Sequence, residues 1–463
     1  MKKMTNEIKL ISPIDGSVYL TRSPLSRDDA FAAAHRARQA ARGSWAGRPV
    51  RERVDLVLKA VEIVGQSTDR MALELAHQMG RPIRYGGEFG GFNERAQYMA
   101  KIAEEGLADD VIEDSDTFRR VIKRVPWGVV LVVAPWNYPY MTAINTIAPA
   151  LIAGNTVMLK HAAQTLQVGE RLAEAFHQAG VPKEVFQNVI LDHDTTSALI
   201  SERAVDFVNF TGSVGGGQAM ERAAAGTFIP VSTELGGKDP GYVRIDANLD
   251  AAVDTLMDGA IFNAGQCCCG IERIYVEQSL FPAFVEKAVI WAKALKLGNP
   301  LDPETMLGPM ANQRFADVVR GQVADAVRDG ATAHVPQKAA DDGVGPYVTP
   351  QVLTGVTHDM RVMREETFGP VVGIMPVGDD FEAVRLMNDT NFGLTASVWT
   401  KDAHAAERIG DLIETGTVFM NRCDYLDPAL CWTGCKDTGR GAGLSTLAYQ
   451  SLTRPKSYHL RKN

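Results

Sequence analysis

The stretch Val129-Val130-Leu131-Val132-Val133-Ala134-Pro135-Trp136-Asn137-Tyr138-Pro139 is an unbroken apolar run followed by an irregular turn. A strand in which every residue is apolar is typical of a parallel sheet that is buried on both faces. Functional groups in open α/β sheets lie at the carboxyl ends of the strands. The turn that begins at Pro135 is therefore well placed to carry a site.

Strand and helix patterns alternate after this run. Helices are expected at about 139–153, 165–180 and 197–204, and strands at 156–160, 189–191 and 207–210. A second series begins at Pro240, with helices near 249–264 and 280–294. Alternation at this spacing implies right-handed crossovers and a doubly wound α/β sheet.

The chain before this run is mainly helical in pattern. A short strand at 8–11 is followed by a helix through about 41, which Ser26-Arg27-Asp28-Asp29 opens as a capping box. Helical patterns also cover 51–80 and 91–107, and a polar, basic strand covers 116–124. A last strand at 451–460 contains Pro455, which suits an edge or inter-subunit position.

Length and composition limit the class of protein. A chain of 463 residues should contain two or three domains, and its net charge of -8 argues against a nucleic-acid or membrane partner. The start of the chain has no pattern of a signal peptide, and the longest apolar run is too short to span a membrane. Clustered cysteines without spaced partners fit a reducing compartment, so a cytoplasmic location is expected.

Three of the six cysteines are consecutive, at Cys267, Cys268 and Cys269. Adjacent side chains should diverge, and structural zinc usually takes pairs spaced by two to four residues, so no metal site is predicted. A thiol reacts only as the thiolate, which requires a lowered pKa or a nearby base. Glu234 lies 34 residues before Cys268 and is the candidate base. The alternative for any lone cysteine is a buried, inert side chain.

Further candidate groups follow predicted strands. The loop from Gly212 to Gly217, with Ser213, offers backbone amides and a helix N-terminus to a pyrophosphate, although an ordinary connector is an alternative. The amide of Asn137 can donate to an oxyanion, or it can cap its own backbone. Lys160 ends a strand, which is a position for a functional group. The alternative is an ordinary surface lysine.

Together these segments resemble the aldehyde dehydrogenase superfamily over essentially the whole chain. The nucleophile of that family is the second residue after a Gly-Gln pair, which here is Cys268. The turn Pro135 to Pro139 is close to the family's Pro-Trp-Asn-Phe-Pro. Segments 366–370 and 434–441 match two further motifs, the latter with Thr433 and Thr438 as departures.

The resemblance implies two doubly wound Rossmann-type α/β domains plus a bridging β-hairpin for oligomerisation. The cofactor-binding domain would comprise 1–113 and 127–237, the catalytic domain 238–440, and the bridging segments 114–126 and 441–463. The bridging hairpin pairs subunits in the family, so a homodimer or homotetramer is expected.

The resemblance also implies a reaction. The Cys268 thiolate would attack an aldehyde, Asn137 and the Cys268 N–H would stabilise the oxyanion, and Glu234 would activate the water that hydrolyses the thioester. The expected cofactor residues are Trp136, Lys160, Ala163, Gly212, Ser213, Gly217, Glu366 and Phe368. One alternative is an acylating, CoA-dependent aldehyde dehydrogenase, but such relatives commonly lack the glutamate. The other alternative is a catalytically silent binding homologue, in which Cys268, Glu234 or Asn137 would be replaced.

Cofactor and substrate preferences rest on single positions. NAD-preferring relatives often have a glutamate where this chain has Ala163, so dual use of NAD and NADP is predicted, with His161 assisting when protonated. The expected substrate pocket consists of Tyr138, Thr142, Asn145, Cys269 and Trp432. Asn145 stands where succinic semialdehyde enzymes have an arginine, so we expect a medium-sized, partly apolar aldehyde without a carboxylate.

Overall fold

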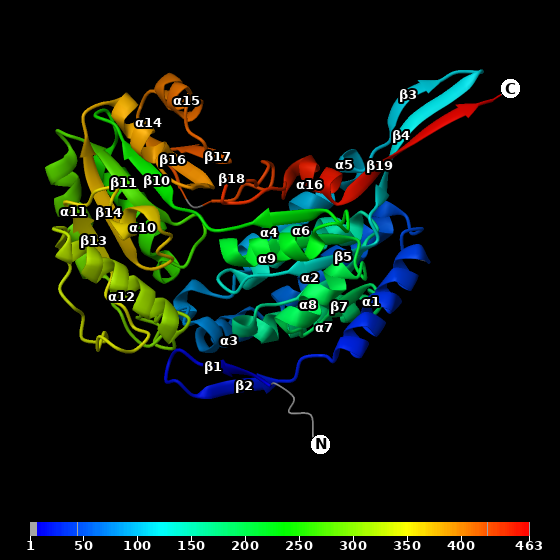
Figure 1. The fold of residues 1–463 in the computed structure, drawn as a ribbon, viewed down its shortest axis with the longest axis horizontal. Coiled ribbons are helices and arrows are strands. Elements are labelled where there is room, and N and C mark those ends of the chain that lie inside the picture. The colour runs from blue at the N-terminus through cyan, green and yellow to red at the C-terminus, as the bar shows by residue number, and fades with distance from the viewer. Residues whose placement is uncertain (1–6, 44, 424, 463) are drawn as a thin grey trace.

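The computed structural model describes residues 7–43, 45–423 and 425–462, and it contains two large sheets and a projecting arm (Figure 1). Among these residues, no helix is both long enough and apolar enough to pass through a bilayer. The two sheets form two lobes, and the candidate site lies where loops of both lobes meet.

The first sheet has the order β7-β6-β5-β8-β9, and all its strands are parallel. Its strands are β5 (Val129–Val133), β6 (Thr156–Lys160), β7 (Phe186–Asn188), β8 (Phe207–Thr211) and β9 (Val231–Glu234). The crossovers are α6 (Pro139–Ile152), α7 (Leu166–Ala179), α8 (His193–Ser201) and α9 (Val214–Ala224). Alternate residues of β5 belong to two different apolar cores, Val130 and Val132 to one and Leu131 to the other. The apolar run is thus explained by helices on both faces.

The N-terminal segment covers the first sheet. It contains β1 (Ile8–Ile11), β2 (Val18–Arg22), α1 (Arg27–Arg42), α2 (Val50–Gly65), α3 (Thr68–Met79), η1 (Ile83–Tyr85), α4 (Phe89–Lys101) and α5 (Ala103–Gly106). The N-cap of the expected capping box is present, because Ser26 Oγ accepts the N–H of Asp29 at 3.1 Å. The helical pattern expected at 51–80 forms two helices, α2 and α3, since the chain breaks after Gly65. A Cβ on Gly65 would lie 2.5 Å from the Phe89 ring, so this close helix contact requires glycine.

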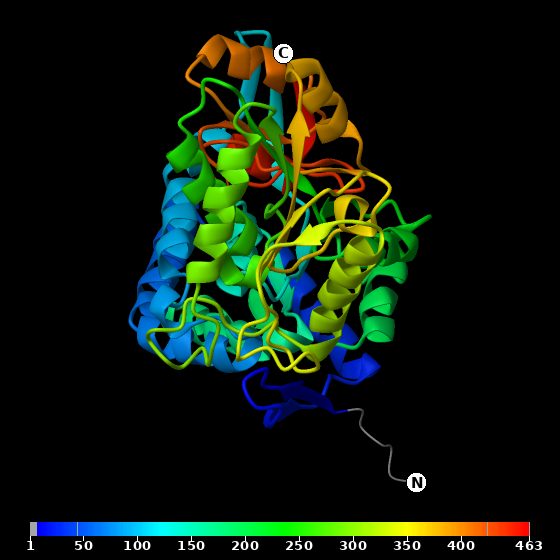
Figure 2. The ribbon, with the colours of Figure 1, turned by 90° about the vertical axis from the view of Figure 1, so that its left-hand side faces the viewer.

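The second sheet has the order β12-β13-β14-β11-β10-β16-β17 and is parallel except for the β12–β13 pair. Its strands are β10 (Asp239–Val243), β11 (Ile271–Glu277), β12 (Thr332–Ala333), β13 (Gln351–Thr354), β14 (Val371–Val377), β16 (Thr395–Trp399) and β17 (Thr417–Met420). Its helices are α10 (Leu249–Ile261), α11 (Phe281–Ala294), α12 (Gln313–Arg328), α13 (Arg361–Arg364), α14 (Asp380–Asn388) and α15 (Ala403–Gly410). Ile274 and Tyr275 enter different cores, and Figure 2 shows helices on both sides of these strands.

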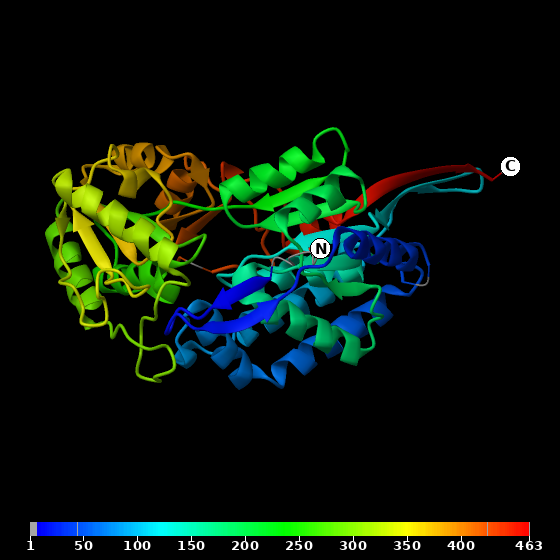
Figure 3. The same ribbon diagram turned by 60° about the horizontal axis from the view of Figure 1, so that its bottom comes forward.

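The arm is an antiparallel sheet of order β19-β4-β3, formed by β3 (Asp110–Asp114), β4 (Phe118–Pro126) and β19 (Thr453–Arg461). It extends away from both lobes and ends near the C-terminus (Figure 3). A small pair, β15 (Phe392–Gly393) and β18 (Cys435–Lys436), and the helix α16 (Ser445–Ser451) lead the chain back toward it. Pro455 lies in β19, an edge strand, where a missing N–H is tolerated.

Two expected strands differ from the structure. The strand expected at 189–191 is β7, Phe186–Asn188, because Phe186 stacks on Phe176 with ring centroids 4.6 Å apart while Val189 and Leu191 pack into the core after the strand. The last strand begins at Thr453, since Ser451 ends α16. The first error arises because apolar runs mark burial, and burial does not require a strand.

Candidate active site

A cavity of about 1190 Å³ lies at the carboxyl ends of β5, β6, β8 and β9 and is closed by loops of the second lobe. Nearly all the predicted site residues line it: Cys268, Glu234, Asn137, Trp136, Lys160, Ala163, Gly212, Ser213, Glu366, Phe368, Tyr138, Thr142, Asn145, Cys269 and Trp432. Gly217 does not, because it faces Leu235, where a Cβ would lie 2.7 Å from the leucine side chain. Its role is to let α9 approach β9.

The loop before Cys268 has an unusual backbone. Asn263 and Ala264 adopt left-handed conformations, with φ of 56° and 57°, and Gly265 follows with φ of 67°. A Cβ on Gly265 would lie 2.1 Å from the carbonyl oxygen of Gly369, so only glycine fits. Backbone strain of this kind persists where surrounding contacts enforce it, and it fixes the position of Cys268.

Two buried side chains tie the Cys268 loop to the Asn137 turn. Asn263 Nδ2 donates to the carbonyl oxygens of Asn137 and Gln266, each at 3.2 Å. Arg81 donates to Asn263 Oδ1 at 3.1 Å and to the Asn137 carbonyl at 2.6 Å. Neither residue was predicted from the sequence. Asn263 lies within the cysteine motif and could have been predicted from it, whereas the residues around Arg81 form no recognisable motif.

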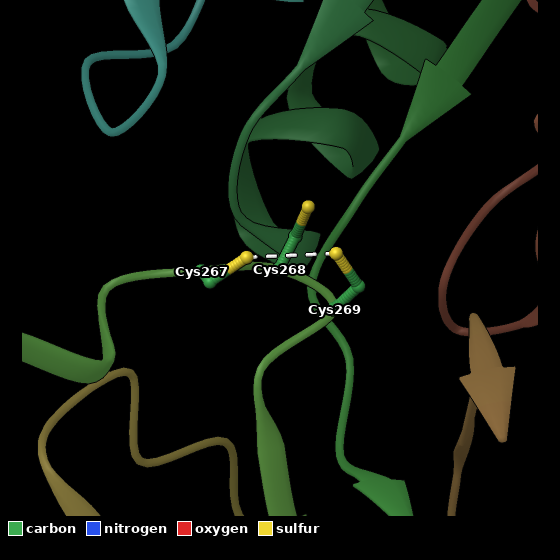
Figure 4. A group of neighbouring side chains, drawn as sticks. All are labelled: Cys267, Cys268 and Cys269. Carbon is green, nitrogen blue, oxygen red and sulfur yellow. Dashed lines mark hydrogen bonds between the residues drawn. The ribbon is translucent and has the colours of Figure 1, made fainter. Parts of the chain in front are cut away.

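The three thiols converge, so the expectation that their side chains diverge is wrong. Their sulfur atoms lie within 4.8 Å of one another, and Cys267 Sγ is 3.5 Å from Cys269 Sγ (Figure 4). The cause is a tight turn in which the Gly270 N–H donates to the Cys267 carbonyl at 3.2 Å. In the part of the chain described, no fourth His, Cys, Asp or Glu joins this group.

The convergence activates Cys268. Hydrogen bonds from the flanking thiols of Cys267 and Cys269 lower the pKa of Cys268 to about 6, against the opposing effect of burial. Figure 4 shows the Cys268 sulfur pointing away from the contact between the other two. A thiol with this pKa is mostly thiolate at neutral pH, which is the nucleophilic form.

The side-chain amide of Asn137 is free of protein hydrogen bonds within the described residues, although the residue is only 6% exposed. Its backbone carbonyl takes the bonds from Arg81 and Asn263 instead. The alternative in which the amide caps its own backbone is therefore wrong. An unpaired amide in the wall of a cavity is available to a bound molecule.

Glu234 lies at the end of β9 and faces the same cavity. Part of its surface is open to the cavity, yet burial raises the pKa of its carboxyl to about 7, against weaker effects of Arg95 and Thr211. Thr211 Oγ1 lies 3.5 Å from Oε2. A carboxyl that titrates near neutral pH is suited to proton transfer.

A second group of residues fits a dinucleotide. Burial lowers the pKa of Lys160, and no acidic partner of its ammonium is found in the described chain. Gly212 and Gly216 lie against the Phe210 ring, where a Cβ would be 2.8 Å and 2.4 Å from its end. Ser213 Oγ accepts the Gly216 N–H at 3.3 Å and caps α9. A partly buried cation beside a glycine-lined helix N-terminus is suited to phosphate groups.

The loop 366–368 faces this group from the second lobe. Glu366 accepts the Gly237 N–H at 3.1 Å, and burial raises the pKa of its carboxyl to about 8. Phe368 meets the Trp136 ring edge-on, with centroids 5.5 Å apart. A buried ion pair between Lys238 and Glu272, which the sequence analysis missed, holds the loop, because Glu272 accepts the Phe368 N–H at 2.8 Å.

Two residues near the site depart from the sequence analysis. His161 is buried, and burial lowers the pKa of its ring to about 4, so the expectation that it assists as a cation is wrong. Arg95 of α4 lines the cavity and was missed. Its Nη1 donates to the Met141 carbonyl at 2.9 Å and to Asn145 Oδ1 at 3.3 Å. Helical spacing in 91–107 gave no sign that this arginine faces inward.

Comparison with known proteins identifies relatives along the whole chain. The pattern of the aldehyde dehydrogenase family matches residues 1–458. A succinate-semialdehyde dehydrogenase [NADP(+)] of Mycolicibacterium paratuberculosis is 34% identical, over 97% of this chain and 96% of the relative. A betaine aldehyde dehydrogenase of Bacillus subtilis is 31% identical, over 98% and 94%. A solved indole-3-acetaldehyde dehydrogenase with NAD+ has a TM-score of 0.94 and 30% identity, over 98% and 93%.

Proposed function

This chain belongs to the aldehyde dehydrogenase family and oxidises an aldehyde to the carboxylic acid with NAD or NADP, and we propose that Cys268, Asn137 and Glu234 carry the reaction. The observation that carries the proposal is that one cavity holds a thiol of lowered pKa, a carboxyl of raised pKa and an unpaired amide. The fold and the reaction class follow from the family, and the assignment of these three roles is our own.

The first half of the reaction belongs to Cys268 and Asn137. The Cys268 thiolate attacks the carbonyl carbon and forms a thiohemiacetal, while the Asn137 amide and the Cys268 N–H donate to the oxyanion. One such donor is typically worth about 3 kcal/mol in the transition state. When bound, the nicotinamide supplies the acceptor for the hydride, and the thiohemiacetal becomes a thioester.

The second half belongs to Glu234. Its carboxylate takes a proton from water as the water attacks the thioester carbon, and the acid leaves as the Cys268 thiolate is released. Because burial raises the pKa of Glu234 to about 7, the carboxyl can both accept this proton and lose it again near neutral pH. The presence of Glu234 in the cavity also weighs against the acylating reaction, in which a thiol replaces water.

The replacement of Glu234 by Gln tests this division of labour. Glu234→Gln should give a burst of reduced cofactor of at most one equivalent per active site, followed by turnover at least about a hundredfold slower, because the thioester forms but is not hydrolysed. Stopped-flow absorbance of the reduced cofactor measures both phases. Unchanged steady-state turnover that CoA accelerates would instead favour the acylating reaction.

The residues that surround the cavity also support a cofactor assignment. We assign Lys160, Gly212 and Ser213 to the phosphates and ribose of the adenosine half, with Trp136 and Ala163 beside them. Glu366 and Phe368 are assigned to the nicotinamide half. The support for this division is that the first group follows β5, β6 and β8, whereas the second group lies on the opposite lobe.

Assembly and location are part of the proposal. We propose a homodimer or homotetramer paired through the arm, because the arm exposes apolar side chains, Val111, Ile112 and Leu460, that a monomer would leave in water. We propose a cytoplasmic location, because all six cysteines are reduced, with none in a disulfide, and oxidising compartments favour disulfides.

The relatives leave the substrate open. The name of one relative specifies succinate semialdehyde, which carries a negative charge, and the name of the other specifies betaine aldehyde, which carries a positive charge. Relatives of nearly equal identity therefore act on aldehydes of opposite charge. The substrate of this chain has to be argued from its own cavity.

A further inference from the structure

Arg95 is a buried cation in the wall of the active-site cavity. The residue is 8% exposed, and in the part of the chain that the structure describes it forms no ion pair. Its neighbour Glu88 is engaged elsewhere, since it pairs with Arg81 and accepts the N–H groups of Tyr140 and Met141. Because an uncompensated buried charge destabilises a fold, an anion from outside the chain is the natural counter-charge.

Arg95 keeps hydrogen-bond donors for such an anion. Its Nη1 serves the Met141 carbonyl and Asn145 Oδ1, while Nε and Nη2 donate to no described residue. A guanidinium presents these donors in a fixed planar fork that matches the two oxygens of a carboxylate. The free side of the fork is therefore suited to bind a carboxylate.

Asn145 of α6 adds a further donor. An arginine only donates hydrogen bonds, so the atom of Asn145 that faces it must be the amide oxygen. The Asn145 amide nitrogen is then turned elsewhere, and it has no partner among the described residues. Asn145 is 3% exposed and lines the same cavity. The pair thus combines one positive charge with a neutral N–H donor.

This pair shares the cavity with the reacting groups. Electrostatic interactions link Arg95 with Cys269, Glu234 and Cys268, although none of them is an ion-pair partner. A short substrate whose aldehyde carbon meets Cys268 would place its other end within reach of Arg95. Tyr138 and Trp432 line the cavity as well and supply apolar surface for the carbons between.

Resting on the proposed function, we infer that Arg95 and Asn145 form the recognition site for the far end of the substrate, and that the substrate is an aldehyde carrying a terminal carboxylate. The sequence analysis expected no carboxylate because Asn145 replaces an arginine on α6. The structure supplies the cation from α4 instead, and Asn145 orients it.

The charge count favours a carboxylate over a phosphate. Arg95 carries one positive charge, which balances one carboxylate, whereas a phosphate ester carries nearly two negative charges at neutral pH. Lys160, a partly buried cation of the same cavity, lies at the end of β6 and belongs to the proposed cofactor group. A phosphorylated aldehyde would therefore leave one negative charge unbalanced.

Matched pairs of aldehydes test this inference. The substrates are 4-oxobutanoate with butanal, and 6-oxohexanoate with hexanal, each pair having one chain length and differing in the carboxylate. We expect wild-type kcat/KM for at least one carboxylated member to exceed that of its partner about a hundredfold. Arg95→Met should lower this ratio about a hundredfold, mainly through KM, because the fork is lost and the side-chain volume is retained.

Two further variants sharpen the test. Lys101→Met removes a positive charge from the same helix at a residue outside the cavity, so the ratio should stay within about threefold of wild type. Asn145→Asp keeps the residue size and places a negative charge beside Arg95 that offsets its positive charge. It should lower the ratio of kcat/KM within each pair of aldehydes as strongly as Arg95→Met does. It also provides the test if Arg95→Met does not fold.

The outcomes separate this inference from the reaction itself. Equal wild-type kcat/KM values within both pairs would overturn the carboxylate site while leaving Cys268-dependent oxidation intact. An equal loss for both members of a pair in Arg95→Met would also overturn it and assign Arg95 to support of the reacting groups. Oxidation that survives in Cys268→Ala would overturn the proposed function instead.

Discussion

At the scale of single residues, the pKa of Cys268, the proposed nucleophile, is set by its two neighbouring thiols. The flanking thiols lower the pKa of Cys268 to about 6, so the rate of its alkylation by iodoacetamide should rise with pH through about 6 and level off above about 7. The sign follows because only the thiolate reacts, and its fraction grows as pH passes the pKa. The pH dependence of the alkylation is obtained from rates of inactivation by iodoacetamide, measured from about pH 5 to about pH 9.

Variants of the three cysteines check this assignment. Cys268→Ala should abolish turnover and the fast alkylation, while Cys267→Ala and Cys269→Ala should keep substantial activity. Each flanking variant should also move the midpoint of the profile upward, because one hydrogen bond to the thiolate is lost. A profile that stays unchanged in both flanking variants would contradict the account.

We expect the residue at position 163, an alanine, to set the preference between NAD and NADP. Ala163→Glu should shift preference toward NAD, because two like charges about 4 Å apart at an effective dielectric near 20 repel by roughly 4 kcal/mol. Kcat/KM for NAD and NADP measures the shift, and Ala163→Gln is the control of equal size without charge. A wild-type preference for NAD above about a thousandfold, some 4 kcal/mol, would show that another group excludes the phosphate.

Sequence motifs located the residues to which we assign the reaction better than the residues that hold them in place. Cys268, Glu234 and Asn137 stand in short segments with recognisable neighbours, and the fold brings all three to one cavity. Arg95, Arg81 and Lys238 come from segments without a chemical signature. Their roles depend on which way a helix or strand faces after packing, and a linear pattern does not carry that information.

At the scale of elements, the loop 262–265 is a strained segment that holds a catalytic group. Asn263→Ala should lower kcat about tenfold or more and stability by about 2 kcal/mol, because two donors are lost and Arg81 Nε is left unpaired. Kcat and urea unfolding measure the two effects. Cofactor binding should be unchanged.

A capping asparagine provides the control for this loop. Asn248 Oδ1 accepts the Ala251 N–H at 3.3 Å at the start of α10, away from the cavity. Asn248→Ala should therefore lower stability by about 1 kcal/mol and leave kcat unchanged. If both variants lowered kcat equally, the effect of Asn263 would be one of general stability.

Regular elements were predicted well where local pattern and burial agree. The run 129–133 is β5, and Ser26 caps the start of α1. Short strands were not predicted, because β2, β12, β15 and β18 are defined by their partners. Phe392 in β15 pairs with Lys436 in β18, a contact that only the finished fold creates. The conversion of three adjacent cysteines into a converging group depends in the same way on a turn.

At the scale of the whole molecule, the arm projects from the lobes and leaves Ile112 and Leu460 exposed. Ile112→Glu combined with Leu460→Glu should shift the assembly toward monomers, because both side chains are exposed and charged groups resist burial at an interface. Sedimentation velocity measures the shift. Phe381→Glu, at an exposed residue of α14 on the other lobe, should leave the assembly intact. A monomeric wild type would contradict the proposed pairing.

The bonds between Arg81, Asn137 and Asn263 join residues that belong to different lobes. Neither lobe holds a complete set of reacting groups, since Asn137 and Glu234 come from the first sheet and Cys268 from the loop before β11. An ancestor that acquired a foreign lobe by recombination would have kept the reaction only if Arg81 and Asn263 still matched. The contacts between the two lobes must therefore be inherited together, and a substitution on one side of them requires a matching substitution on the other.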